Sequence, residues 1–151
     1  MIVSAFFSFA VSHGVPEKGE VKDLMISRRE GMAKDGIDSY SLNYAKDCAN
    51  FYFMYQHLLE TNIKIYRYED VIFKKEAWLR DMLDYLEIEA DSSLITSVAA
   101  QNDIIPAEEQ PEMHIRQVHP GNYKKHLQDE TIEQLNFALS SILDRYGYSR
   151  D

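Results

Sequence analysis

The densest group of side chains able to bind an anion lies in residues 114–125, HIRQVHPGNYKK. This stretch brings one arginine, two lysines and two histidines together in a chain whose formal net charge is −9. The planar guanidinium of Arg116 offers paired donors that suit phosphate or sulfate oxygens, and Gly121 allows a ligand to approach the backbone closely. The stretch indicates an anion site, with a solvated basic loop on an acidic surface as the equally weighted alternative.

Tyr68, Glu69 and Asp70 form a second candidate group, because they directly follow an alternating apolar segment. Ligands of open α/β sheets bind beyond the carboxyl ends of strands, so this tripeptide is a candidate edge of a site. The alternative is that Glu69 or Asp70 caps the next helical turn, a common use of such residues.

The residue pattern gives little support for a metal site or for catalysis. His114, His119 and His126 have spacings that match no compact ligand set, so we expect no metal site. Ser4 lies in an apolar context without a neighbouring residue that could act as a base. The glycine-rich phosphate-binding motifs G-x-x-x-x-G-K-[ST] and G-x-G-x-x-G are both absent from the sequence. These residues alone predict a soluble helical domain with an anion site and no catalytic residues.

Composition and net charge indicate the class of protein and argue against some classes of binding partner. The 151 residues are 45% hydrophobic, which predicts one ordinary globular domain. Sixteen Lys and Arg against 25 Asp and Glu argue against binding to nucleic acid or to an anionic membrane. Cys48 is the only cysteine, so no intrachain disulfide forms and a cytoplasmic location is expected. The longest apolar stretch, residues 1–11, is about half the length of a membrane-spanning helix.

The elements that must position these residues are mostly helical. Apolar spacing of three and four residues predicts helices, whereas Ile63 and Ile65 alternate with Lys64 and Tyr66 and predict a strand over residues 62–68. A lone strand has no partner for its backbone hydrogen bonds, so either further strands lie in weak segments or the rest of a sheet lies outside the chain. Helices are expected over residues 21–32, 39–60, 74–86, 91–101 and 129–146, and residues 1–13 are expected to form a buried helix or a strand-to-helix junction. An irregular segment is expected over residues 102–120.

Three residues mark expected ends or breaks of these helices. Asp91 suits the N-cap of the helix over 91–101, and Gly147 suits a left-handed conformation after the last turn of the C-terminal helix. Gly36 interrupts the polar segment before residue 39.

The order of these segments resembles the C-terminal part of the PAPS-dependent sulfotransferases, which transfer a sulfuryl group from 3′-phosphoadenosine 5′-phosphosulfate (PAPS) to a hydroxyl or amine. The likeness covers essentially all of residues 1–151, as the C-terminal part of a single sulfotransferase domain. It rests on a helix start with a serine (MIVSAFFSF), a long aromatic helix, a strand ending in IKIYRYED, and Arg-x-x-x-x-Gly-x-aromatic from Arg116 to Tyr123. It implies an α/β fold class, a partial P-loop-like sulfotransferase fold that is mostly helical here, with a strand over residues 62–68.

The resemblance also implies a site for PAPS and its product PAP, 3′-phosphoadenosine 5′-phosphate. Ser4 matches the family serine that binds the 3′-phosphate at a helix N-terminus, where free N–H groups favour an anion. Tyr68 matches the tyrosine beside the adenine, and Thr96 and Val98 match the outer members of a Thr-Ser-Phe segment that contacts adenine. Arg116 matches the arginine of the Arg-Lys-Gly signature, which binds the 3′-phosphate.

Two departures from the family pattern bear on function. Gln117 and Val118 stand where the family often has Lys and Gly, which leaves Gln117 as an uncharged residue in the implied cofactor site. The family's phosphosulfate loop, catalytic lysine and histidine base precede the serine segment, and the chain begins only three residues before Ser4. Because transfer needs positioned charge around the moving group, we expect a sulfotransferase fragment that is inactive by itself.

The expected partners follow from this interpretation. The acceptor is a small molecule of unidentified structure, and surface left uncovered by missing strands promotes self-association. One alternative is a helical protein-interaction module in which residues 114–125 dock an acidic partner. Another is a nucleotide-binding regulatory module without catalysis.

Overall fold

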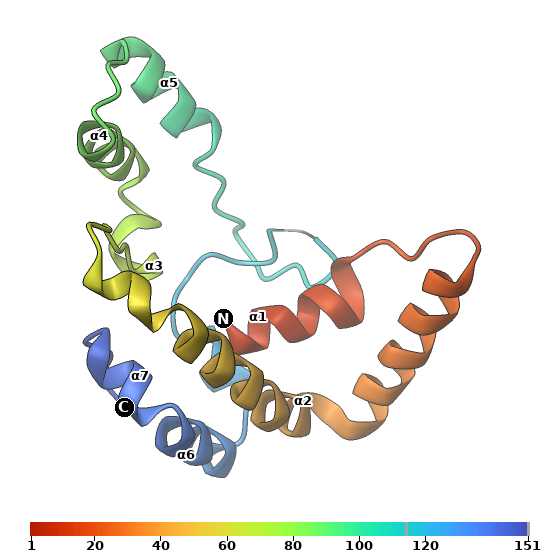
Figure 1. Ribbon diagram of the computed structural model, residues 1–151. Helices are drawn as coiled ribbons and strands as arrows, with labels where there is room; N and C mark the ends of the chain where they lie inside the picture. Colours follow the sequence, from red (N-terminus) through yellow and green to blue (C-terminus); the bar gives the residue numbers. More distant parts are fainter. Residues whose placement is uncertain (114, 151) are drawn as a thin grey trace. The chain divides into compact units, whose positions relative to one another are not determined.

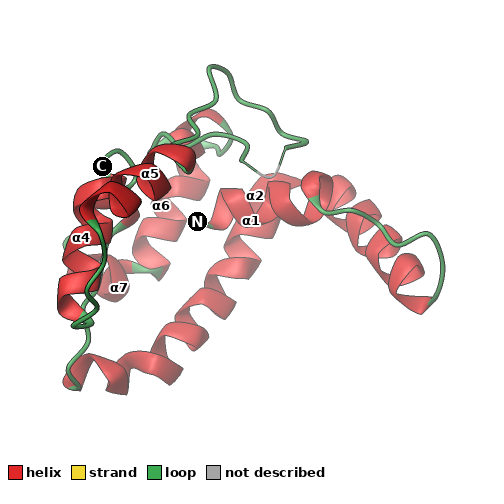
Figure 2. Cartoon of the chain, turned by 90° about the horizontal axis from the view of Figure 1, so that it is seen from above, coloured by secondary structure: helices red, strands yellow, loops and turns green. Residues whose placement is uncertain are grey.

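The computed structural model of the chain describes residues 1–113 and 115–150. Helices and connecting loops make up this part of the chain, and it contains no strand (Figures 1 and 2). The predicted α/β, P-loop-like fold class is therefore wrong. The α-helices are α1 (Ile2–Phe7), α2 (Glu20–Tyr55), α3 (Tyr68–Val71), α4 (Lys75–Tyr85), α5 (Ser92–Gln101), α6 (Asp129–Ala138) and α7 (Ser140–Arg145). A short π-helix, η1 (Ser8–Ser12), and two short 3-10 helices, η2 (Gln56–Glu60) and η3 (Asn122–Lys125), complete the helical elements.

The predicted strand over residues 62–68 is also wrong, because the segment is irregular and its last residue begins α3. Arg67 does have extended backbone angles, with φ −82° and ψ 140°. Ile63 and Ile65 lie on the same face of an extended segment and are 41% and 49% exposed, so this face is not covered. A strand is stabilised by the N–H and C=O groups of a neighbour, and the described residues provide no neighbouring strand. The alternating pattern thus predicted an extended backbone but not its pairing.

The chain forms two compact units. The first contains the described residues of Met1–Glu60, Pro111–His114 and Gly121–Asp151, and the second contains Thr61–Gln110 and Ile115–Pro120. In the first unit both α1 and α6 pack against α2, and α7 packs against α6. In the second unit α4 packs against α5 and α3 against α4.

The long helix α2 consists of two helical stretches that meet at Gly36. Its φ of 78° and ψ of 170° are not helical, and such a positive φ favours glycine. This break separates the two helices predicted over residues 21–32 and 39–60, and both are confirmed. Arg29 donates hydrogen bonds to the carbonyl oxygens of Phe9, Val11 and His13, which fastens the first stretch to the end of η1. None of the helices in the described ranges combines the length and apolar character needed to cross a membrane.

Small buried side chains form the contact between α1, α2 and α6. Val3 and Ala45 are 5% and 3% exposed, and Ser41 is completely buried. The Ser41 hydroxyl has no hydrogen-bond partner among the described residues, which is an energetic cost at this helix contact. Asp38 accepts a hydrogen bond of 2.9 Å from the Gln128 N–H and so fixes the start of α6 on α2.

The C-terminal helix predicted over residues 129–146 is present as α6 and α7. Leu139, with φ −102° and ψ 11°, interrupts the helical backbone between them. Gly147 has the left-handed φ of 67° that was predicted for the residue after the last turn.

In the second unit, Asp91 is the N-cap residue of α5, as predicted. Its side chain accepts hydrogen bonds from the N–H groups of Ser93 and Leu94, at 2.7 and 3.3 Å. On α4, Lys75 donates to the carbonyl oxygen of Asn102 at 2.9 Å and pairs with Asp103 at 2.8 Å. These bonds fasten the segment that leaves α5 to the start of α4.

Candidate nucleotide-binding site

Two segments that are 50 residues apart in sequence meet in the second unit at Tyr68 and Val118. The Tyr68 hydroxyl donates a hydrogen bond of 2.9 Å to the carbonyl oxygen of Val118. Burial of the phenol raises the pKa of Tyr68, and the nearby charge of Glu69 raises it further. The hydroxyl therefore remains a donor at neutral pH. The residue as a whole is still 47% exposed. The tyrosine expected beside adenine therefore lies against the segment that carries Arg116.

Arg116 is the most buried charged residue of this segment, with 7% of its surface exposed. Its guanidinium forms an ion pair with Glu109. Burial lowers the pKa of Arg116, because a charged group is disfavoured away from water. A guanidinium nevertheless stays charged in proteins at neutral pH. The Gln110 N–H donates to the Arg116 carbonyl oxygen at 2.9 Å, which joins the two segments through their backbones. The guanidinium thus already faces an oxyanion, a carboxylate of the same chain.

The neighbours of Arg116 are held in the same unit. Val118 is 5% exposed, and Gln117 is half-buried between it and Arg116. The ring of His119 packs against the ring of Phe73, with centroids 5.2 Å apart. Residues 116–119 are therefore positioned by packing as well as by the bond from Tyr68.

The Asp70 carboxylate, two residues after Tyr68, does not cap α3. Asp70 accepts two hydrogen bonds from the Arg67 guanidinium, at 2.7 and 3.0 Å, and these bonds lower the pKa of Asp70. Arg67 occupies the N-cap position of α3 without a side-chain capping bond. The capping alternative for Asp70 is therefore wrong, and this carboxylate is used in a surface ion pair.

Thr96 and Val98 stand on α5, where they have different surroundings. The Thr96 hydroxyl lies 3.0 Å from the Glu76 carboxylate and 3.4 Å from the Arg80 guanidinium, both on α4. Val98 is 40% exposed and offers apolar surface. Thr96 therefore joins α5 to α4, whereas Val98 is accessible for an apolar contact of the kind expected with adenine.

Ser4 belongs to the first unit, whereas the other five predicted site residues belong to the second. It lies in the first turn of α1 with its side chain exposed, so the predicted position at a helix start is confirmed. Its carbonyl oxygen accepts a hydrogen bond from the Ser8 N–H at the end of α1. Within the second unit, the structure brings Tyr68 together with the segment of Arg116 and Gln117.

The basic stretch of residues 114–125 is divided between the units, since residues 115–120 belong to the second and the residues from Gly121 onward to the first. Gly121 has the left-handed φ of 83° and precedes η3, whose Lys124 and Lys125 are exposed. Lys124 and Lys125 therefore do not share a compact unit with Arg116. One cluster of cations over residues 114–125 stays a prediction.

Two of the three histidines considered as metal ligands, His119 and His126, pack against aromatic rings. His114 lies outside the described residues. His126 packs on the ring of Phe7 with centroids 4.9 Å apart, and its Nε2 lies 3.2 Å from the side-chain nitrogen of Asn122. His119 packs on Phe73, so His119 and His126 each contact an aromatic ring of their own unit.

Sequence reasoning missed Glu109. Its local signal is its place beside Glu108, five positions before the start of the basic stretch, and nothing in that spacing indicates a bond to Arg116. The pairing depends on how the segment after α5 returns to residues 115–120, which is a property of the tertiary structure.

Comparison with known proteins finds no relative of the chain. No family model, no curated protein and no solved structure matched the chain. The roles considered for Tyr68, Val98 and Arg116 therefore depend on the sequence resemblance and on the contacts described above.

Proposed function

We propose that the chain binds the adenosine and the 3′-phosphate of PAPS and of its product PAP. The hydrogen bond from Tyr68 to Val118 carries this proposal, because it holds an aromatic ring beside the Arg116 segment within one compact unit. The ring supplies a stacking surface for a purine, and the guanidinium supplies paired donors for a phosphate. A phosphoadenosine requires both kinds of contact.

The chemistry of the donor set fits the nucleotide. Arg116 is buried and paired with the carboxylate of Glu109, so its guanidinium is oriented toward an oxyanion. The exposed side chain of Val98 offers the apolar contact, while Gln117 beside Arg116 is an uncharged hydrogen-bonding group. PAPS supplies, when bound, the activated sulfuryl group for a hydroxyl or amine acceptor. The residues proposed here bind the nucleotide, and none of them is assigned to the transfer step.

Calorimetric titration of PAP and 5′-AMP into the wild-type chain tests this proposal. We expect PAP to bind more tightly, because only PAP carries the 3′-phosphate. Arg116→Lys keeps the charge but loses the planar fork, and we expect it to weaken PAP binding roughly tenfold and to leave 5′-AMP unchanged. Arg80→Lys is the matched control, since Arg80 pairs with Glu76 in the same unit. Equal affinities of PAP and 5′-AMP for the wild-type chain would contradict the proposal.

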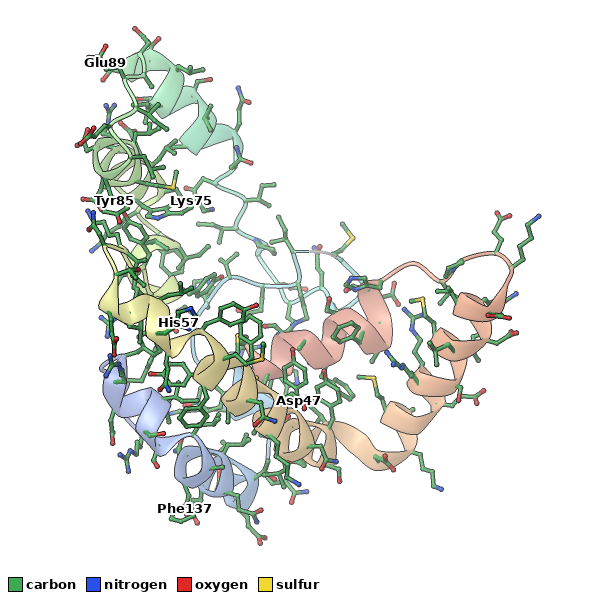
Figure 3. The ribbon with its side chains drawn as sticks, viewed as in Figure 1. Asp47, His57, Lys75, Tyr85, Glu89 and Phe137 are labelled. Carbon is green, nitrogen blue, oxygen red and sulfur yellow. The ribbon has the colours of Figure 1, made fainter. Side chains whose placement is uncertain are left out.

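A helical interaction module is the second candidate function, and exposed apolar side chains of the first unit favour it. Phe137 lies on α6 (Figure 3) and is 85% exposed. Phe51 and Met54 on α2 are 65% and 66% exposed. Phe137 also lines an open hollow of about 670 Å³ between α2 and α6, together with Leu42 and Ala49. Contiguous apolar surface is typical of sites that bind other proteins, and Phe51 and Met54, three residues apart on α2, lie on one helix face.

We expect the chain to work in the cytoplasm. Cys48 is a half-buried free cysteine, and burial raises the pKa of its thiol. A protonated thiol of this kind is stable in a reducing compartment and contributes no disulfide. Fractionation of cells that express the full chain tests this expectation, and recovery from a secreted fraction would contradict it.

A further inference from the structure

The ion-pair partner of Arg116 is an anion that the chain itself supplies. Glu109 lies at the end of the irregular segment that follows α5, and its carboxylate pairs with the guanidinium. The Arg116 side chain is 8% exposed and the Glu109 side chain 24% exposed. The carboxylate is therefore the more solvent-exposed member of the pair.

The segment that carries Glu109 is fastened at both ends. Lys75 holds its start through Asn102 and Asp103, and the Gln110 N–H holds its end through the Arg116 carbonyl oxygen. Between these ties, Ile104 and Ile105 are 52% and 46% exposed. The middle of the segment is thus weakly packed, whereas Glu109 is kept beside Arg116 by the adjacent backbone bond.

We propose that Glu109 is an internal ligand that competes with the 3′-phosphate of the nucleotide for Arg116. This inference rests on the proposed function, because it concerns the same guanidinium. A carboxylate and a phosphate are both negative, and like charges at one guanidinium repel each other across the few ångströms that separate them. The phosphate therefore binds Arg116 only when the Glu109 carboxylate moves away toward solvent.

This competition has two consequences for binding. The carboxylate neutralises a buried guanidinium in the nucleotide-free chain, where an unpaired charge would be costly. It also lowers the net affinity for PAP, because breaking the Glu109 pair opposes every binding event. Glu109 thus sets how readily the nucleotide is released.

Substitution of Glu109 by glutamine tests the competition in the full chain. The amide of Glu109→Gln retains the shape and hydrogen-bonding capacity of the side chain and removes its charge. We expect calorimetry to show PAP binding roughly tenfold more tightly, which corresponds to the loss of one partly screened charge pair. We expect binding of 5′-AMP, which lacks the 3′-phosphate, to stay unchanged.

Glu108→Gln is the matched control, because Glu108 is the adjacent, exposed acidic residue and undergoes the same change of charge. We expect it to alter PAP affinity by less than about twofold, the effect of an exposed, solvent-screened charge. Equal gains in the two variants would show a general charge effect and would overturn the role of Glu109.

The remaining outcomes separate this inference from the proposed function. If the wild-type chain prefers PAP to 5′-AMP but Glu109→Gln binds PAP no more tightly, the internal ligand is refuted and the nucleotide site stands. If the wild type does not prefer PAP to 5′-AMP, the nucleotide site fails, and the internal ligand, which rests on that site, fails with it. If Glu109→Gln loses its helical circular dichroism, Glu109→Asp replaces it in the test, because it keeps the charge on a shorter side chain. Tighter PAP binding by Glu109→Asp than by the wild type supports the inference, and unchanged binding overturns it.

Discussion

The hydroxyl of Tyr68 donates to the carbonyl oxygen of Val118 at 2.9 Å, across 50 residues of sequence. The bond joins the start of α3 to the segment that contains Arg116, and both parts lie in one compact unit. Each segment by itself has an ordinary interpretation, as a helix start or as a basic loop. Their juxtaposition places an aromatic ring and a guanidinium-bearing segment together, which is why this unit is the proposed nucleotide site.

Tyr68→Phe removes this bond and retains the ring. We expect the free energy of unfolding to fall by about 1 kcal/mol, the net value of one hydrogen bond, as measured by denaturant titration. We also expect PAP affinity to fall severalfold, because the Arg116 segment loses one of its fixed points.

Tyr85→Phe is the control for this prediction. The Tyr85 hydroxyl donates to the Asn62 carbonyl oxygen at 2.6 Å in the same unit, so the same atom is deleted elsewhere. We expect a similar loss of stability and no change in PAP affinity. Equal effects of the two variants on affinity would contradict a local role for Tyr68.

Asp91 makes the stability of α5 depend on pH. Hydrogen bonds from the Ser93 side chain and from the N–H groups of Ser93 and Leu94 lower the pKa of Asp91. A carboxyl whose folded pKa is depressed contributes stability above its unfolded pKa of about 3.9 and loses it as pH falls through the folded value. We therefore expect Asp91→Ala to lower Tm at neutral pH and to approach the wild-type Tm in acid.

Asp91→Asn provides the comparison, because asparagine is a good N-cap residue that does not titrate. We expect its Tm to remain close to that of the wild type at neutral pH. Thermal denaturation followed by circular dichroism at several pH values checks both variants. A Tm difference between wild type and Asp91→Ala that is independent of pH would refute the titrating cap.

Local features of the fold were predictable from the sequence, and features that depend on distant residues were not. Asp91 caps α5, Gly36 breaks α2 and Gly147 takes a left-handed conformation, as neighbouring residues indicate. The pattern at Ile63 and Ile65 predicted a strand, but pairing requires another segment, and the described residues supply none.

The same distinction applies to the candidate site. Arg116 and Tyr68 were identifiable by residue type and by the sequence resemblance. Glu109 was not, because its bond to Arg116 forms only when the segment after α5 returns to residues 115–120. The burial of Arg116 likewise follows from packing, which local charge and spacing do not specify.

The exposed aromatic and apolar side chains of the first unit predict self-association. We expect light scattering to show a mass that rises with concentration, because association removes apolar surface from water. Substituting Phe51 and Phe137 together by serine should lower this mass, since these side chains are 65% and 85% exposed. Gln134→Ser on α6 is the control. A monomer at every concentration would contradict the prediction.

Phosphorus NMR of PAP tests the central claim most directly, because it separates the 3′-phosphate from the 5′-phosphate in one titration. We predict that adding the wild-type chain shifts the 3′-phosphate resonance and that the shift is largely lost with Arg116→Lys. An unmoved 3′-phosphate resonance, or the same shift with both proteins, would contradict the binding of this phosphate by Arg116.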